Sequence, residues 1–203
     1  GLDRFGSLDP SEGGKSLRST GRLDYHYDLP GGGTAFANLW AQYYYLSLFT
    51  NFTFFLNDQV NGDGIEQTDR RWLTGSDIGY RQIFRLLDYE GTMTAGLQTR
   101  FDKIQVRLGT QQKRSSLAIT QESDIFEASY SPYLKLDLQF LPWLRFVGGG
   151  RVDVFTYNVN DRCGTGCSVR PDGTASDAIA SGKANVIFGP WARTEFFMNV
   201  GTG

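Results

Sequence analysis

The residue types that most often carry chemistry in proteins are sparse in this sequence. Its 203 residues include one histidine and two cysteines. The histidine, His26, lies among alternating polar positions, and the sequence has no Gly-x-Ser-x-Gly elbow of the kind that presents a nucleophilic serine. A Ser-His-Asp triad would have to be built around this one imidazole. We therefore predict no catalytic residues and no cofactor, and we expect that the protein is not an enzyme.

The two cysteines lie close together in the chain. Cys163 and Cys167 flank Gly-Thr-Gly in a long polar stretch, and with no histidine near them they lack the other ligands of a zinc site. The oxidising environment outside a cell favours a bond between two such thiols. We predict a small disulfide between Cys163 and Cys167 and no metal at this position.

Another polar stretch carries oxygen atoms of the kind that calcium prefers as ligands. The residues concerned are Asp58, Asn61, Asp63 and Glu66. Their spacing does not reproduce the ligand positions of an EF-hand loop. We predict a solvated loop here and assign no metal ligands anywhere in the chain.

The composition predicts that β-strands position these residues. The chain has 25 glycines, 10 tyrosines and 15 phenylalanines but only 2 methionines. This composition is typical of pleated surfaces joined by tight turns. Lys and Arg number 20 against 22 Asp and Glu, so no positive excess would attract nucleic acid. Hydrophobic residues make up 40% of the chain but never form the run of about eighteen that a membrane-spanning helix needs. Both nucleic-acid binding and a helical membrane protein are therefore excluded.

Apolar and polar residues alternate with a period of two over long segments. Residues 16–29, 126–140 and 144–154 each place apolar or small side chains on one face and polar ones on the other. Such a period indicates strands. We predict eight strands, at residues 16–29, 34–55, 71–84, 92–106, 125–140, 143–158, 182–188 and 193–201.

The links between these segments alternate in length. Residues 30–33, 85–91, 141–143 and 189–191 are short and rich in turn-forming residues, whereas residues 57–70, 107–124 and 159–181 are long and polar. Links this short make consecutive strands antiparallel. Short turns at one rim and long loops at the other are typical of outer-membrane barrels.

A soluble antiparallel sheet also alternates, so the length of the strands and the placement of charge decide between the two. Several segments run to about fourteen residues, whereas strands of soluble proteins average about five or six. The apolar positions from Phe126 to Phe140 carry no charge, as a lipid-facing surface requires. We therefore predict an all-β fold, an antiparallel transmembrane β-barrel segment of about eight strands with short periplasmic turns and long extracellular loops.

The charged residues of the opposite face should then line the lumen of the barrel. We predict lumen-facing charges at Arg71, Asp77, Arg81, Arg100, Asp102, Glu127, Arg145, Arg151 and Asp153. They either pair with one another across strands in a wet interior or form hydrogen bonds with a plug.

Several stretches resemble one family, the TonB-dependent outer-membrane receptors. The stretches are residues 6–18, beginning Gly-Ser-Leu-Asp-Pro, residues 57–67, Gly-Leu-Gln-Thr-Arg-Phe-Asp at 96–102, residues 143–153 with Arg-Val-Asp after a glycine, and Glu-Phe-Phe-Met-Asn-Val-Gly at 195–201. Together they extend over nearly the whole chain. The resemblance implies that residues 1–203 are part of a receptor barrel of about 22 strands, without the plug and the C-terminal strands.

The resemblance also implies a function in transport. We expect an integral protein of the cell outer membrane that captures a scarce small extracellular ligand, such as a ferric siderophore, and imports it with energy from TonB. The expected partners are TonB, contacted through the absent parts, membrane lipid, lipopolysaccharide and that ligand, with no nucleic acid. Two alternatives remain at this point, a complete small eight-stranded outer-membrane protein that is structural or a passive channel, and an outer-membrane enzyme.

Overall fold

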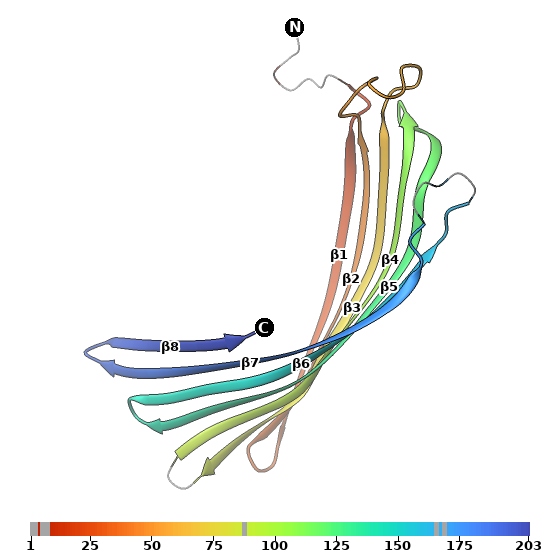
Figure 1. Ribbon diagram of the computed structural model, residues 1–203. Coiled ribbons are helices and arrows are strands. Elements are labelled where there is room, and N and C mark those ends of the chain that lie inside the picture. Colours follow the sequence, from red (N-terminus) through yellow and green to blue (C-terminus); the bar gives the residue numbers. More distant parts are fainter. Residues whose placement is uncertain (1–3, 5–8, 87–88, 165–166, 168–169) are drawn as a thin grey trace.

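The computed structural model describes residue 4 and residues 9–86, 89–164, 167 and 170–203, which form a single eight-stranded sheet (Figure 1). Each strand pairs antiparallel with the next in sequence, so the order is β1 to β8 with no crossover. The strands are β1 (Gly13–Leu29), β2 (Gly33–Thr50), β3 (Ile65–Leu86), β4 (Tyr89–Gln112), β5 (Ser115–Leu141), β6 (Leu144–Asp161), β7 (Gly173–Trp191) and β8 (Thr194–Thr202). The predicted all-β fold of eight antiparallel strands is confirmed. Among the described residues there is no helix with the length and apolar character of a membrane span.

The predicted long loop at residues 107–124 is wrong. β4 continues to Gln112 and β5 begins at Ser115, so only Lys113 and Arg114 form the turn, both with positive φ. Two register shifts near Leu108 and Thr110 accompany this extension. The backbone ladder persists here while the hydrophobic alternation fades, and alternation was the only signal that the sequence offered for a strand.

Other strand ends also differ from the predictions. β3 begins at Ile65 rather than residue 71, and β7 begins at Gly173 rather than residue 182, whereas β2 already ends at Thr50. The first half of β7 consists mostly of small residues, which leave little periodic signal. The predicted turn at residues 85–91 shrinks to residues 87 and 88, which lie outside the described residues, as do residues 6–8 of the first family-like stretch.

The connections of the sheet differ at its two ends (Figure 1). At one end the turns are short: residues 30–32 contain Gly31 and Gly32 with positive φ, and Ala192 and Arg193 turn the chain into β8. At the other end lie the longer connections, residues 51–64 and 162–172, together with the tip of the β4–β5 hairpin. We call these the turn end and the loop end.

The register assigns every strand residue to one of two faces. One row of paired residues, on what we call the apolar face, is Leu23, Leu39, Ser76, Thr99, Tyr130, Val154 and Ala178. A neighbouring row, on what we call the polar face, is Asp24, Asn38, Asp77, Gln98 and Ser131. Because side chains alternate along a strand, these rows fix the face of all other paired positions.

The sheet is a single layer, so its apolar face has no second layer of protein to pack against. Leu134 on that face is 51% exposed, and Leu23 is 63% exposed. Lys135 and Asp137 lie on the opposite face, with Asp137 paired to Val147 of β6. The leucines of β5 are therefore exposed on this sheet, and an apolar surface of this extent is typical of a face that contacts a partner or a membrane.

Candidate functional site

All nine charged residues that were predicted to share a face do lie on the polar face. The register places Arg71, Asp77 and Arg81 of β3 on it, with Arg100 and Asp102 of β4, Glu127 of β5, and Arg145, Arg151 and Asp153 of β6. They are neighbours across four consecutive strands. This polar face is the candidate functional site.

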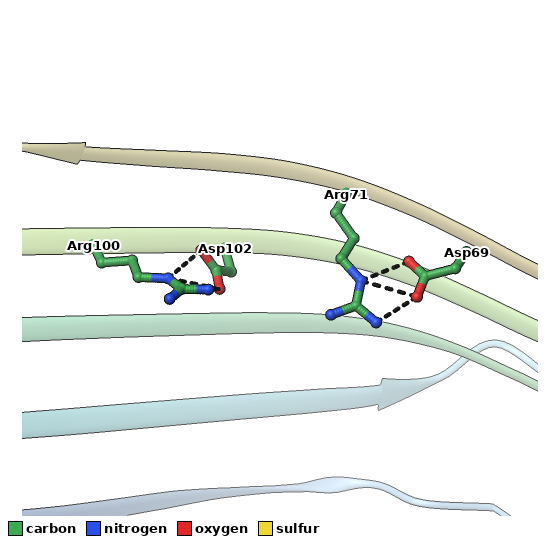
Figure 2. Close-up of polar contacts among 4 residues, drawn as sticks. All are labelled: Asp69, Arg71, Arg100 and Asp102. Atoms are coloured by element: carbon green, nitrogen blue, oxygen red, sulfur yellow. Dashed lines mark hydrogen bonds and ion pairs between the residues drawn. The ribbon is translucent and has the colours of Figure 1, made fainter. Parts of the chain in front are cut away.

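Two arginine–aspartate pairs on β3 and β4 run along their strands (Figure 2). Arg100 Nε donates to Asp102 Oδ1 at 3.0 Å and its terminal nitrogen donates to Oδ2 at 2.6 Å. Arg71 Nε donates in the same way to Asp69 Oδ1 at 2.7 Å. Residues two apart in a strand point to the same face, which allows this bidentate contact. Sequence reasoning missed Asp69, because the residue fell inside a predicted loop.

A third Arg–Asp pair, on β6, is part of a network that extends over three strands. Arg151 Nε donates to Asp153 Oδ1 at 2.6 Å, and Ser131 of β5 donates to the same oxygen at 2.6 Å. Arg151 also donates to Gln98 Oε1 of β4 at 2.6 Å. A further ion pair crosses between strands, from Arg145 to Asp137 at 2.6 Å.

The arginine is the more exposed partner in each of these pairs. The Asp102 side chain is only 4% exposed whereas that of Arg100 is 55% exposed, and the pairs of Asp69, Asp137 and Asp153 follow the same order. The carboxylates are thus covered while guanidinium N–H groups face outward from the sheet. The polar face therefore presents hydrogen-bond donors and positive charge to whatever lies against it.

The polar face is concave. Tyr133 of β5 donates to Asp77 of β3 at 3.0 Å, and Arg151 reaches from β6 to β4, so side chains two strands apart meet. A hollow of about 640 Å³ lies on this face and is lined by residues from β1 to β5, among them His26, Asp77 and Lys135. Side chains come together in this way on the inner side of a curved sheet.

Aromatic rings on the polar face lie against glycines of the neighbouring strand. A Cβ atom at Gly96 would be 2.6 Å from the Tyr133 ring, and one at Gly79 would be 2.5 Å from the Phe36 ring. Both contacts are closer than a Cβ atom permits, so a larger residue at either position would force the ring to move. These glycines were not predicted as part of the site, although they occupy polar-face positions where the sequence offers no other reason for them.

The loop formed by residues 51–64 uses its own carboxylates for internal hydrogen bonds. Asp63 accepts from the Thr53 hydroxyl at 2.6 Å and from the Asp58 backbone N–H at 2.7 Å, which lowers the pKa of Asp63 to about 2. Asp58 accepts the backbone N–H of Asn61 at 2.9 Å, and its pKa is lowered as well. Within the described part of the chain no three His, Cys, Asp or Glu residues group as metal ligands.

The loop formed by residues 162–172 contains both cysteines. The structure joins Cys163 to Cys167, with their Cα atoms 6.1 Å apart. The backbone N–H of Arg162 donates to the Glu122 carbonyl of β5 at 2.9 Å, and Asp161 accepts the backbone N–H of Cys163 at 2.9 Å. Arg162, next to the disulfide, is thus held against β5 at the loop end.

Comparisons with known proteins identify the fold. No protein-family model matches the sequence, and no curated protein matches it. Among solved structures, the chain resembles the ferric citrate transporter FecA in its unliganded form, with a TM-score of 0.78, 13% identity, and coverage of 98% of this chain and 29% of that one. The copper transporter OprC gives a TM-score of 0.71 with 13% identity, covering 94% of this chain and 31% of that one. The open form of the ferric-catecholate import receptor Fiu from E. coli K12 gives a TM-score of 0.69 with 11% identity, covering 98% of this chain and 38% of that one. At these identities the likeness shows the fold, and the chain spans about a third of the length of those proteins.

Proposed function

We propose that this chain is part of the barrel wall of a TonB-dependent receptor in a bacterial outer membrane. In this proposal the whole protein captures a scarce extracellular ligand, such as a ferric siderophore, and imports it. One observation carries the proposal: a continuous uncharged band on one face of all eight strands lies back to back with a concave face rich in paired charges. The sequence resemblance and the fold shared with two transporters and an import receptor support it.

The apolar face has the properties of a lipid-contacting surface. From the row of Thr74 to the turn end, no described residue of this face is charged in any strand. An arginine or lysine at the bilayer midplane costs about 2–4 kcal/mol, so such a band persists where lipid is the solvent. Tyr43 and Trp72 are in ring contact at its loop end, and Trp143 and Trp191 at its turn end, as aromatic girdles are.

The concave face supports a role in accommodating a partner inside the barrel. Its guanidinium groups are presented outward from covered aspartates, which favours acceptors such as the carboxylates of a plug or of an anionic ligand complex. Ordered pairs of this kind need no rearrangement to receive such groups. Each of these aspartate carboxylates is held by an arginine, which supports binding and transport over an enzymatic role.

The arrangement of the edges supports a large barrel over a complete eight-stranded one. In the described residues β1 pairs only with β2, and β8 only with β7. A closed eight-stranded barrel would pair β1 with β8. We therefore infer that further strands continue the sheet on both sides, and that a plug fills the lumen of the whole protein.

Uptake by the full-length protein in cells tests this proposal. A strain that has this protein as its sole receptor should take up radiolabelled ferric complexes and lose that uptake when TonB is deleted. Replacing Arg100 and Arg151 with glutamine should reduce uptake while the protein still inserts into the outer membrane. The same assay is run with a panel of ferric complexes and with copper. If TonB deletion changes the uptake of none of them, the proposal is overturned.

A further inference from the structure

Charged residues on the apolar face are confined to its loop end. They are Lys15, Glu66, Arg70, Lys103, Arg107, Glu122 and Asp124. Six of them lie on the loop side of the ring contact between Tyr43 and Trp72, and Lys103 is paired with Trp72 at the level of that contact. Charges that begin where an apolar band ends mark the level of lipid headgroups.

Three of these cations form a cluster on β1, β3 and β4, which we call the outer basic cluster: Lys15, Arg70 and Lys103. The Tyr45 ring lies between two of them, with Lys15 Nζ 5.9 Å and Arg70 Cζ 5.6 Å from its centroid. Lys103 is one step off the register from Arg70, because Arg70 pairs with Gln105 and Lys103 pairs with Trp72. Such diagonal neighbours are about 7–8 Å apart.

The cluster keeps its positive charge unneutralised by protein. All three side chains are exposed, and no ion pair joins them to any described carboxylate. The nearest acidic residue on this face, Asp124, is paired with Arg162 at 3.4 Å and accepts from Gln105 at 3.2 Å. On the polar face, by contrast, Arg71, Arg100, Arg145 and Arg151 are each paired with an aspartate. Three adjacent cations without partners indicate an anionic group supplied from outside the chain.

We propose that the outer basic cluster binds the phosphate groups of a lipid headgroup in the leaflet at the loop end, which in an outer membrane is lipopolysaccharide. This inference rests on the membrane placement proposed above. The guanidinium of Arg70 binds a phosphate in bidentate geometry, Lys15 and Lys103 add point charges on either side, and the Tyr45 ring provides a surface between them. The acyl chains of the same lipid then lie along the uncharged band below.

Binding of a defined lipid by the full-length protein in detergent tests the inference. The probe is bisphosphorylated lipid A, with dephosphorylated lipid A and inorganic phosphate as separate arms, and the bound fraction is measured by native mass spectrometry. The variant Lys15→Gln/Arg70→Gln/Lys103→Gln should bind bisphosphorylated lipid A about a hundredfold more weakly, at about fivefold per cation. Arg70→Lys should retain most of the affinity lost in Arg70→Gln.

A matched control removes three cations from the polar face: Arg81→Gln/Lys135→Gln/Lys183→Gln should bind the lipid as the unmodified protein does. Heat-modifiable migration on gels reports whether each variant is folded. The inference is overturned if the cluster variant binds bisphosphorylated lipid A normally, or if the control variant loses as much lipid binding as the cluster variant. It is also overturned if dephosphorylated lipid A binds equally well, or if inorganic phosphate displaces the lipid at an equal concentration. A cluster variant that loses lipid binding but keeps TonB-dependent uptake supports the inference. An unmodified protein that binds the lipid through this cluster but shows no TonB-dependent uptake overturns only the proposed function.

Discussion

Each aspartate of the Arg–Asp pairs on β3, β4 and β6 is held by an arginine two positions along the same strand. A contact within a strand forms as soon as that strand is extended and does not depend on the register with its neighbours. The pairs therefore place guanidinium groups reproducibly, whatever lies against the sheet. Glycines opposite aromatic rings act at the same scale, because they let Tyr133 lie across β4 and reach Asp77.

The Gly96 contact gives a prediction about stability. Gly96→Ala should lower the free energy of unfolding by about 1–3 kcal/mol, because the added methyl group would overlap the Tyr133 ring. Urea-driven unfolding from lipid vesicles measures this change. Gly150→Ala is the control, since the nearest atom to its Cβ is 3.8 Å away. Equal effects of the two substitutions would contradict the proposed role of Gly96.

Residue types and period two predicted much of this site. The alternation placed Arg100, Asp102, Arg151 and Asp153 on one face, and the register of the strands agrees. Asp69 was not predicted as part of the site, because the residues around it do not alternate between apolar and polar and therefore did not indicate a strand. The bond from Arg151 to Gln98 joins residues far apart in the chain and depends on the curvature of the sheet, which no local pattern encodes.

At the scale of elements, the strands divide into a middle part with strict alternation and a loop-end part without it. Lipid demands an apolar residue at every second position only within the band. Beyond it, Thr110, Gln111 and Ser115 pair through their backbones with no such demand. The hydrophobic pattern therefore predicted where strands cross the band and failed to predict where they end.

The loop of residues 51–64 yields a prediction about pH. The pKa of the Asp63 carboxyl, about 2, lies below the ordinary value of 3.8. Ionised Asp63 therefore favours the ordered loop above about pH 4. That contribution is lost as the pH falls through about 2, when protonation removes the acceptor for Thr53 and for the Asp58 N–H. NMR titration of the Asp63 carboxyl should give a midpoint near 2, and the Asn57 and Asp58 amide signals should follow it. In Asp63→Asn those signals should no longer titrate there, and a midpoint at 3.8 would contradict the assignment.

At the scale of the whole molecule, two faces of opposite character share one layer of backbone. Few apolar side chains are buried among the described residues, so backbone hydrogen bonds and the surrounding medium supply much of the stability of the sheet. In the membrane placement proposed above, an unpaired backbone group would cost several kcal/mol, which favours an intact ladder across the band. The two faces should therefore respond very differently to the same substitution.

Adjacent residues of β7 provide a test of this difference. Ala180 lies on the apolar face opposite Val152, and Ile179 lies on the polar face opposite Asp153. Ala180→Arg should lower the free energy of unfolding from lipid vesicles by about 2–4 kcal/mol, whereas Ile179→Arg should change it little. Urea titration of both variants measures the difference. A larger loss for Ile179→Arg would reverse the assignment of the faces.

The tip of the β4–β5 hairpin reaches back to the segment before β1. Arg114 donates from its side chain to the carbonyl oxygens of Ser11 at 2.8 Å and Glu12 at 2.9 Å, over more than 100 residues of sequence. Arg114 thus joins the tip of the β4–β5 hairpin to the segment before β1, and these two hydrogen bonds oppose any movement of the hairpin tip away from the first strand at the loop end.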